Sequence, residues 1–131
     1  MKYRTLEVLD YDAGGQIYGT LDGTLSGDRL SGTLALTNLA GRRPDGVNLP
    51  TLRGILTTGD DARVWVECDG VATLRQSDQA RVFITAVRFR TGDARYSWLN
   101  TTLAVLEGVL DTVGVGGQAH GVLSECRATV A

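Results

Sequence analysis

Residues 81–90 read RVFITAVRFR, and this stretch decides the fold. Alternate positions from Phe83 to Phe89 carry large apolar or threonine side chains, so they share one face of an extended chain. Residues 63–69, RVWVECD, alternate in the same way. A period of two, together with many β-branched and aromatic residues, is typical of β-strands.

Turn-forming residues separate these stretches at intervals of about ten residues, the spacing of an antiparallel meander or barrel. The 17 glycines and only two prolines suit many tight turns. No stretch has the pattern of a capped amphipathic helix, which excludes parallel βαβ folds. The expected strands are about 3–10, 16–25, 29–37, 49–58, 62–69, 71–75, 81–90, 100–111 and 119–130.

Several of these strands carry bulky residues on both faces, which favours a barrel whose interior is filled or holds a ligand. Closure also removes the exposed edges of a long antiparallel sheet. We therefore predict an all-β fold, a small closed antiparallel β-barrel of about eight or nine strands, as a single domain over residues 1–131. An open sandwich is the alternative.

Charge and composition limit the possible partners and compartment. The formal charge is −2 and no basic stripe exists, so nucleic acid is not expected. The first residues lack the apolar core of a signal peptide, and no apolar run is long enough to span a membrane, so we expect a cytoplasmic protein.

Cys68 and Cys126 match no metal-ligand spacing and are expected to be unpaired thiols. The loop 114–117 lacks the lysine and following helix of a phosphate-binding loop.

Residues 84–100, ITAVRFRTGDARYSWLN, resemble the C-terminal motif of the bacterial DUF3237 family. That motif is a Phe-x-Thr-Gly turn followed by Tyr-x-Trp-Leu-Asn. Residues 23–32 resemble the family's N-terminal hairpin, and turns at 45–46 and 58–61 fall where its middle turns lie. The matching motif positions are Phe89, Thr91, Gly92, Tyr96, Trp98, Leu99 and Asn100.

The resemblance implies a small β-barrel of the lipocalin-like or allene-oxide-cyclase-like kind, often oligomeric, with no assigned activity. This chain departs from the family pattern at several positions. Arg90 and Val87 replace an acid and a proline, and the middle strand keeps only Arg53 of an Asp-x-Arg-Tyr pattern. The Gly-x-Asp-Trp motif is missing from residues 37–43. A divergent member is therefore expected.

Three residues are candidates for catalysis. Arg53 is the single charge within an apolar and threonine-rich strand, so we expect it to face a cavity and to bind a carboxylate or enolate oxygen. Glu67 and the lone histidine, His120, are candidates for moving a proton, because histidine titrates near neutral pH. A single histidine excludes multi-histidine metal sites, and no metal or other cofactor is expected. A solvated outer face is the alternative for the charged residues, and a surface position for His120.

Four residues are candidates for ligand binding. Tyr96, Trp98 and Asn100 alternate on one predicted strand and could form an aromatic platform with an orienting amide. A purely structural role is their alternative, since aromatic residues bury large areas and asparagine stabilises turns. Arg88 is predicted to lie close to Glu67 on a neighbouring strand.

Three functions remain open. The first is a cofactor-free isomerase, cyclase or lyase acting on a small organic molecule inside the barrel. The second is a carrier barrel without catalysis. The third is a filled barrel whose outer surface mediates oligomerisation. A homo-oligomer, a dimer or larger, is expected from the resemblance. Interior side chains that were all large and apolar would argue against the first two.

Overall fold

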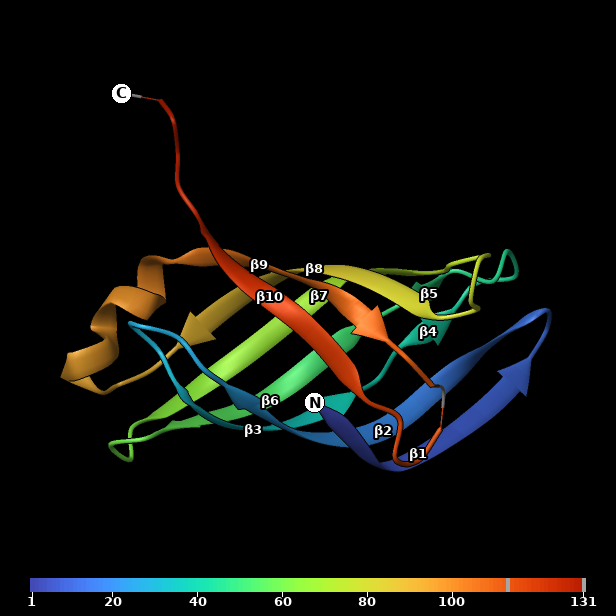
Figure 1. Ribbon diagram of the computed structural model, residues 1–131, viewed down its shortest axis with the longest axis horizontal. Helices are drawn as coiled ribbons and strands as arrows, with labels where there is room; N and C mark the ends of the chain where they lie inside the picture. Colours follow the sequence, from blue (N-terminus) through green and yellow to red (C-terminus); the bar gives the residue numbers. More distant parts are fainter. Residues whose placement is uncertain (113, 131) are drawn as a thin grey trace.

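The alternating stretches form long antiparallel strands in the computed structural model, which describes residues 1–112 and 114–130 (Figure 1). In that part of the chain, ten strands belong to one sheet. Two of them, β4 and β5, have only two residues and continue β3 and β6, so the arrangement fits the prediction of eight or nine strands. The elements are β1 (Lys2–Tyr11), β2 (Gly14–Leu25), β3 (Gly32–Asn38), β4 (Gly41–Arg42), β5 (Asn48–Leu49), β6 (Thr51–Thr58), β7 (Arg63–Leu74), β8 (Arg81–Arg90), η1 (Ala94–Thr101), β9 (Leu103–Leu110) and β10 (Ala119–Cys126).

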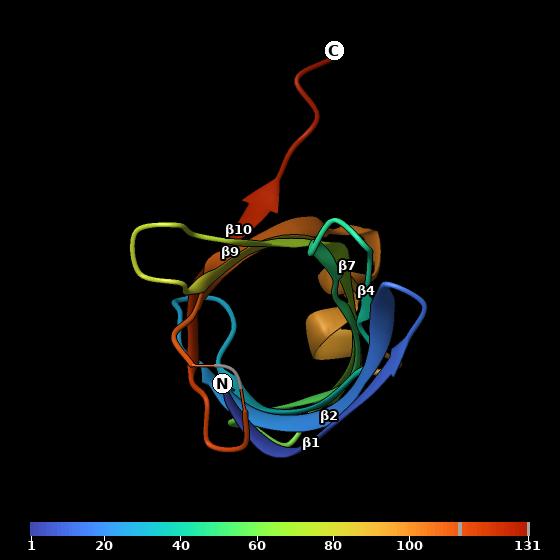
Figure 2. The same ribbon diagram turned by 90° about the vertical axis from the view of Figure 1, so that its right-hand side faces the viewer.

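The sheet is a meander that curls until its first and last strands meet. The long strands lie side by side in the order β1, β2, β3, β6, β7, β8, β9, β10. At the seam, Lys2 bridges to Gln118, and the Ala119 N–H donates to the Met1 carbonyl at 2.8 Å. Seen along the axis, the strands form a ring (Figure 2). The predicted all-β antiparallel barrel is confirmed.

The inward face of the barrel forms the core, because the pleat sends alternate side chains inward. Val64 and Val66 of β7 are buried, as is the alternate set from Phe83 to Phe89 on β8. A Cβ at Gly70 would collide with the backbone oxygen of Ile84 on β8. Glycine at this position therefore allows the close approach of two curved strands.

Residues 94–101 form a 3₁₀ helix, η1, whereas the sequence predicted that Tyr96, Trp98 and Asn100 alternate on one side of a strand. The reason is local. The Asp93 carboxylate accepts the Arg95 N–H at 2.9 Å, and the Tyr96 N–H donates to the Asp93 carbonyl at 3.1 Å. Side-chain capping of this kind starts a helix at a position where β-propensity alone would continue a strand.

Three other predicted boundaries were wrong. The expected strands 62–69 and 71–75 are one continuous strand, β7, because Gly70 bends the chain without ending its pairing. The expected strand 49–58 is divided at Pro50, whose nitrogen cannot donate to a neighbouring strand. The last strand ends at Cys126 instead of residue 130.

The two ends of the barrel differ. Helix η1 covers one end and inserts Leu99, of which 1% is exposed, into the core (Figure 1). We call this the capped end. The opposite end, where β4 and β5 lie, has no such helix in the described residues, and we call it the open end. A helix with the length and apolar character that membrane crossing requires is absent from residues 1–112 and 114–130.

Candidate functional site

An apolar cavity of about 80 Å³ lies inside the open end. Phe83 forms part of its wall, and the exposed Val8 lies at its rim. The space exists because small side chains line it. One is Ala72, which pairs across the strands with Phe83, and two others are Ala40 and Ala119. We call this space the open-end cavity.

Two buried polar atoms of the open-end cavity lack a hydrogen-bond partner within the described residues. They are Oδ1 of Asn48, on β5, and Nε of Arg81, at the start of β8. The Arg81 guanidinium donates at another nitrogen to the Gly46 carbonyl at 2.8 Å, which fixes its position. No carboxylate of residues 1–112 or 114–130 forms an ion pair with Arg81. Buried polar groups are paired in the great majority of cases, so two unpaired ones in one cavity are unusual.

A third polar group of the open-end cavity is the hydroxyl of Tyr3. The Asn38 side-chain amide donates to it at 2.8 Å, and the Asn38 oxygen accepts the Thr51 N–H at 3.2 Å. Tyr3 and Asn38 are both buried. Burial raises the pKa of Tyr3, with a smaller opposing contribution from the Asn38 hydrogen bond. The phenol is therefore neutral at physiological pH.

A β-bulge in β1 turns Tyr3 towards the cavity. Tyr3 pairs with Leu21 and Thr5 pairs with Thr20, so Arg4 is an extra residue relative to β2. Bulges of this kind re-aim side chains. The ring then lies over Gly19, where an added Cβ would lie 2.9 Å from Tyr3 Cε1.

A second interior cavity, of about 300 Å³, lies nearer the capped end and is lined mainly by apolar residues. Met1 and Ala119 line both cavities and so separate them. The buried Cys68 lines the second cavity, and desolvation raises the pKa of its thiol to about 11. Cys68 and Cys126 are both free, as predicted.

Arg53, Glu67 and Arg88 do not face the interior, which corrects the expectation that Arg53 faces an enclosed cavity. They form one cross-strand row on the outside of β6, β7 and β8. Their neighbours Leu52, Val66 and Val87 are buried, so the pleat directs the charged residues outward. Arg53 donates to Asp69 at 3.0 Å and lies 3.9 Å from Glu67 Oε1, and Arg88 lies 3.8 Å from Glu67 Oε2. This placement matches the alternative of a solvated outer face.

His120 is exposed on β10 and borders the second cavity between Ala119 and Gly121. It pairs with Val109 across the strands and is therefore not near Arg53 or Glu67, which lie on β6 and β7. The structure does not bring the three predicted catalytic residues together. A catalytic role for any of them remains a prediction.

Tyr96, Trp98 and Asn100 lie on η1 and hold the capped end together. The Tyr96 hydroxyl donates to the Asp60 carboxylate at 2.9 Å. The guanidinium of Arg29 lies 3.9 Å above the Trp98 ring. Asn100 accepts the Thr91 N–H at 2.8 Å and donates to the Thr91 carbonyl at 3.0 Å. Each side chain is thus engaged with the protein itself, and a ligand-binding role for these residues stays a prediction.

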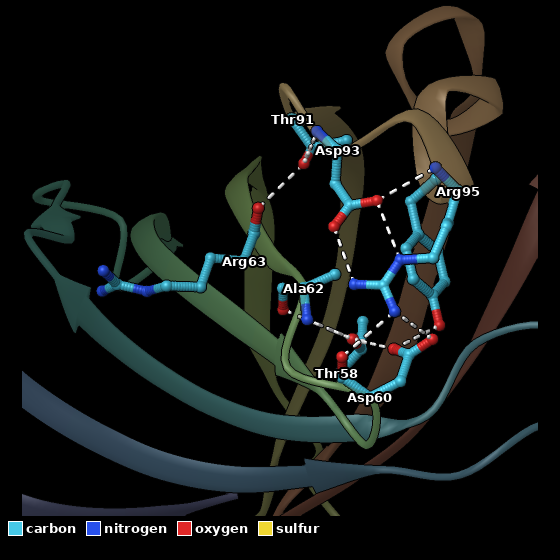
Figure 3. Close-up of polar contacts among 8 residues, drawn as sticks. Thr58, Asp60, Ala62, Arg63, Thr91, Asp93 and Arg95 are labelled. Atoms are coloured by element: carbon cyan, nitrogen blue, oxygen red, sulfur yellow. Dashed lines mark hydrogen bonds and ion pairs between the residues drawn. The ribbon is translucent and has the colours of Figure 1, made fainter.

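Two Thr-Gly-Asp turns, 58–60 and 91–93, are joined at the capped end by Arg95 (Figure 3). Its guanidinium pairs with Asp60 at 3.1 Å and with Asp93 at 2.8 Å. The pKa of Asp60 is lowered mainly by the Thr58 hydroxyl and then by the Tyr96 hydroxyl, and that of Asp93 mainly by the Arg95 hydrogen bond. These contacts fasten η1 to the barrel.

None of the four polar residues of the open-end cavity, Tyr3, Asn38, Asn48 and Arg81, was predicted from the sequence. Arg81 could have been found, because it shares the odd-numbered face of β8 with Phe83 and Phe89. Asn48 follows a short turn and Tyr3 depends on the bulge at Arg4, so alternation identifies neither. Residues 1–112 and 114–130 contain no cluster of three or more His, Cys, Asp or Glu side chains suited to a metal ion.

These features define the class of protein: an antiparallel β-barrel with one capped end and an apolar interior cavity that contains a few polar groups. The chain belongs to the DUF3237 family of proteins of unknown function, whose model matches residues 8–122. The predicted resemblance is therefore confirmed. No curated protein matches the chain.

Several solved structures share this fold. A β-barrel-like protein from Acinetobacter baumannii is 20% identical, with a TM-score of 0.75 over 93% of this chain and 85% of that one. A conserved protein of unknown function from Rhodopseudomonas palustris is 18% identical, with a TM-score of 0.79 over 95% and 90%. A protein described as an enzyme from Penicillium herquei is 23% identical, with a TM-score of 0.66 over 80% and 74%.

Proposed function

We propose that the protein binds a small, mainly apolar organic molecule with an anionic oxygen in the open-end cavity. The observation that carries the proposal is the pair of buried, unpartnered polar atoms, Arg81 Nε and Asn48 Oδ1, in an otherwise apolar lining. Pockets for small molecules combine apolar walls with a few convergent polar groups in this way.

Arg81 favours an anion. Taking a guanidinium partly out of water costs free energy unless a partner compensates it, and Arg81 has no carboxylate partner within the described residues. A bound carboxylate or other oxyanion would supply that partner through a charge-assisted hydrogen bond. Asn48 Oδ1 would accept a hydrogen bond from a hydroxyl or amide group of the same ligand.

Catalysis on that molecule, without a cofactor, is the second candidate. The structural relative from Penicillium herquei is described as an enzyme, which favours this candidate over a passive carrier. An isomerase, cyclase or lyase would use the open-end cavity in place of the outer row of Arg53, Glu67 and Arg88. A non-catalytic carrier is the alternative that turnover assays would separate from it.

Titration with benzoate and with its neutral analogue benzyl alcohol, followed by amide chemical shifts, tests the binding proposal. Benzoate should perturb residues around the open-end cavity and bind more tightly than the alcohol. Arg81→Met should reduce the affinity for benzoate about tenfold, the size expected for losing a hydrogen bond to a charged group. Arg90→Met is the matched control, because Arg90 lies on the outside of the same strand and is exposed.

A blocking variant completes the test. Ala72→Leu fills the open-end cavity and should abolish binding, whereas Ala86→Leu adds the same atoms on the exposed face of β8 and should not. Benzoate binding that survives Ala72→Leu, or that Arg90→Met reduces as much as Arg81→Met does, would contradict the proposal.

A further inference from the structure

The hydrogen-bond network around Tyr3 leaves the proton of its hydroxyl group without an acceptor. Thr51 donates to the Asn38 oxygen, so the Asn38 amide must direct its nitrogen at Tyr3. The Tyr3 oxygen therefore acts as an acceptor towards Asn38. In the described residues no acceptor takes the Tyr3 proton. An O–H donor without an acceptor among the described residues thus lines the same cavity as the unpartnered Nε–H of Arg81.

Two single donors from different residues suit one oxygen atom. A carboxylate is best matched by the two parallel donors of one guanidinium. In Arg81, one terminal nitrogen donates to the Gly46 carbonyl, and Nε is the nitrogen that is buried in the cavity without a partner. One donor from each of Arg81 and Tyr3 resembles the pairs of donors that enzymes direct at a single developing oxyanion.

We infer that Tyr3 and Arg81 together bind the ionised oxygen of an enol- or phenol-type ligand. This inference rests on the proposed function and narrows its ligand class from oxyanions in general to ionised hydroxyl groups. The apolar wall around Phe83 accommodates the ring or chain that carries the oxygen. Because both donors lie in an apolar cavity, their interaction with an anion is stronger than it would be in water.

A phenol that changes colour on ionisation tests the inference directly. Bound 4-nitrophenol should ionise at a lower pH than the free compound, which its absorbance reports. Tyr3→Phe should reduce the preference for the ionised over the neutral form about tenfold, the effect of one hydrogen bond to a charged group. Binding of the neutral phenol should persist. Tyr11→Phe, at an exposed tyrosine of the same strand, is the control.

Replacing Tyr3 with 3-fluorotyrosine covers the case in which Tyr3→Phe fails to fold. Fluorine makes the phenol a stronger donor with little change in volume, so the preference for the ionised probe should increase. If neither benzoate nor 4-nitrophenol enters the open-end cavity, the proposed function fails. If benzoate binds there but 4-nitrophenol does not, or if bound 4-nitrophenol ionises as it does in water or independently of both changes at Tyr3, only the present inference is overturned.

Discussion

The capped end and the cavity inside the open end of the barrel use polar residues in opposite ways. At the capped end, Asp60, Asp93 and Arg95 satisfy one another, and Asn100 bonds twice to the backbone of Thr91. At the open end, Arg81 Nε and Asn48 Oδ1 are buried without partners. Paired networks stabilise a fold, whereas unpaired buried groups cost stability and are retained where a site needs them.

The motif by which the family is recognised has a structural role at the capped end. The Tyr-x-Trp-Leu-Asn stretch contacts Asp60, Arg29 and Thr91, all within the protein. It closes one end of the barrel and lies away from the open-end cavity. A sequence motif can thus mark the fold while the ligand site lies at positions outside it.

Leu99→Ala should have the largest effect on stability. Leu99 is 1% exposed, so its truncation leaves a cavity in the core and should lower the free energy of unfolding by about 2–5 kcal/mol. Urea denaturation measures the change. Leu103→Ala, at a leucine that is 47% exposed, should change the free energy far less. Equal losses would show that η1 does not seal the barrel.

Asn100→Ala should lower the free energy of unfolding by about 1–2 kcal/mol, because it removes two hydrogen bonds to Thr91. Binding of benzoate at the open end should not change. Ser97→Ala, at an exposed residue of the same helix, is the control. A loss of benzoate affinity in Asn100→Ala would contradict the separation of the two ends.

Arg81→Met should leave the free energy of unfolding within about 1 kcal/mol of the original value, or raise it, because it removes a buried unpaired donor. Thermal and urea unfolding test this expectation. The same variant should bind benzoate about tenfold more weakly, so stability and binding change independently. A large destabilisation would indicate that Arg81 is part of the structural framework instead.

Low pH should destabilise the capped end, by less than the substitutions at Leu99 and Asn100 do. The pKa values of Asp60 and Asp93 lie below the ordinary value of 3.8, so their stabilising effect is present above pH 3.8 and disappears as the pH falls through the folded-state values. Trp98 fluorescence in a Trp65→Phe background reports this change. With Asp60→Asn and Asp93→Asn combined, the acid transition of Trp98 should weaken, and an unchanged transition would rule out both carboxylates as its cause.

Alternation along the chain was sufficient to predict the barrel and to divide the residues of β7 and β8 between two faces, but it did not indicate which face forms the core. Alternation also places Arg53 and Glu67 on the outer face, because each is adjacent in the sequence to buried apolar residues. Arg53 was wrongly expected to face a cavity because it is the single charge on its strand. Charge on an otherwise apolar strand is equally compatible with an outer face, where Arg53 pairs with Asp69.

The rest depended on local geometry that a periodic pattern does not contain. The Asp93 cap converts a predicted strand into η1. Pro50 divides a strand and leaves Asn48 in the two-residue strand β5. The bulge at Arg4 changes the inward set of β1, so strict alternation from Leu6 would place Tyr3 outside. Each of these features depends on a single residue, so a hydrophobic pattern with a period of two does not predict it.

The same bulge has a consequence for changes in chain length. Arg4 and Thr5 both point outward, so removing residue 4 would restore regular pairing and keep Tyr3 and Leu6 on the inner face. Elsewhere in a strand, losing one residue exchanges every inward side chain for an outward one. The first strand therefore has one position at which the protein can lose a residue without altering the composition of its cavity.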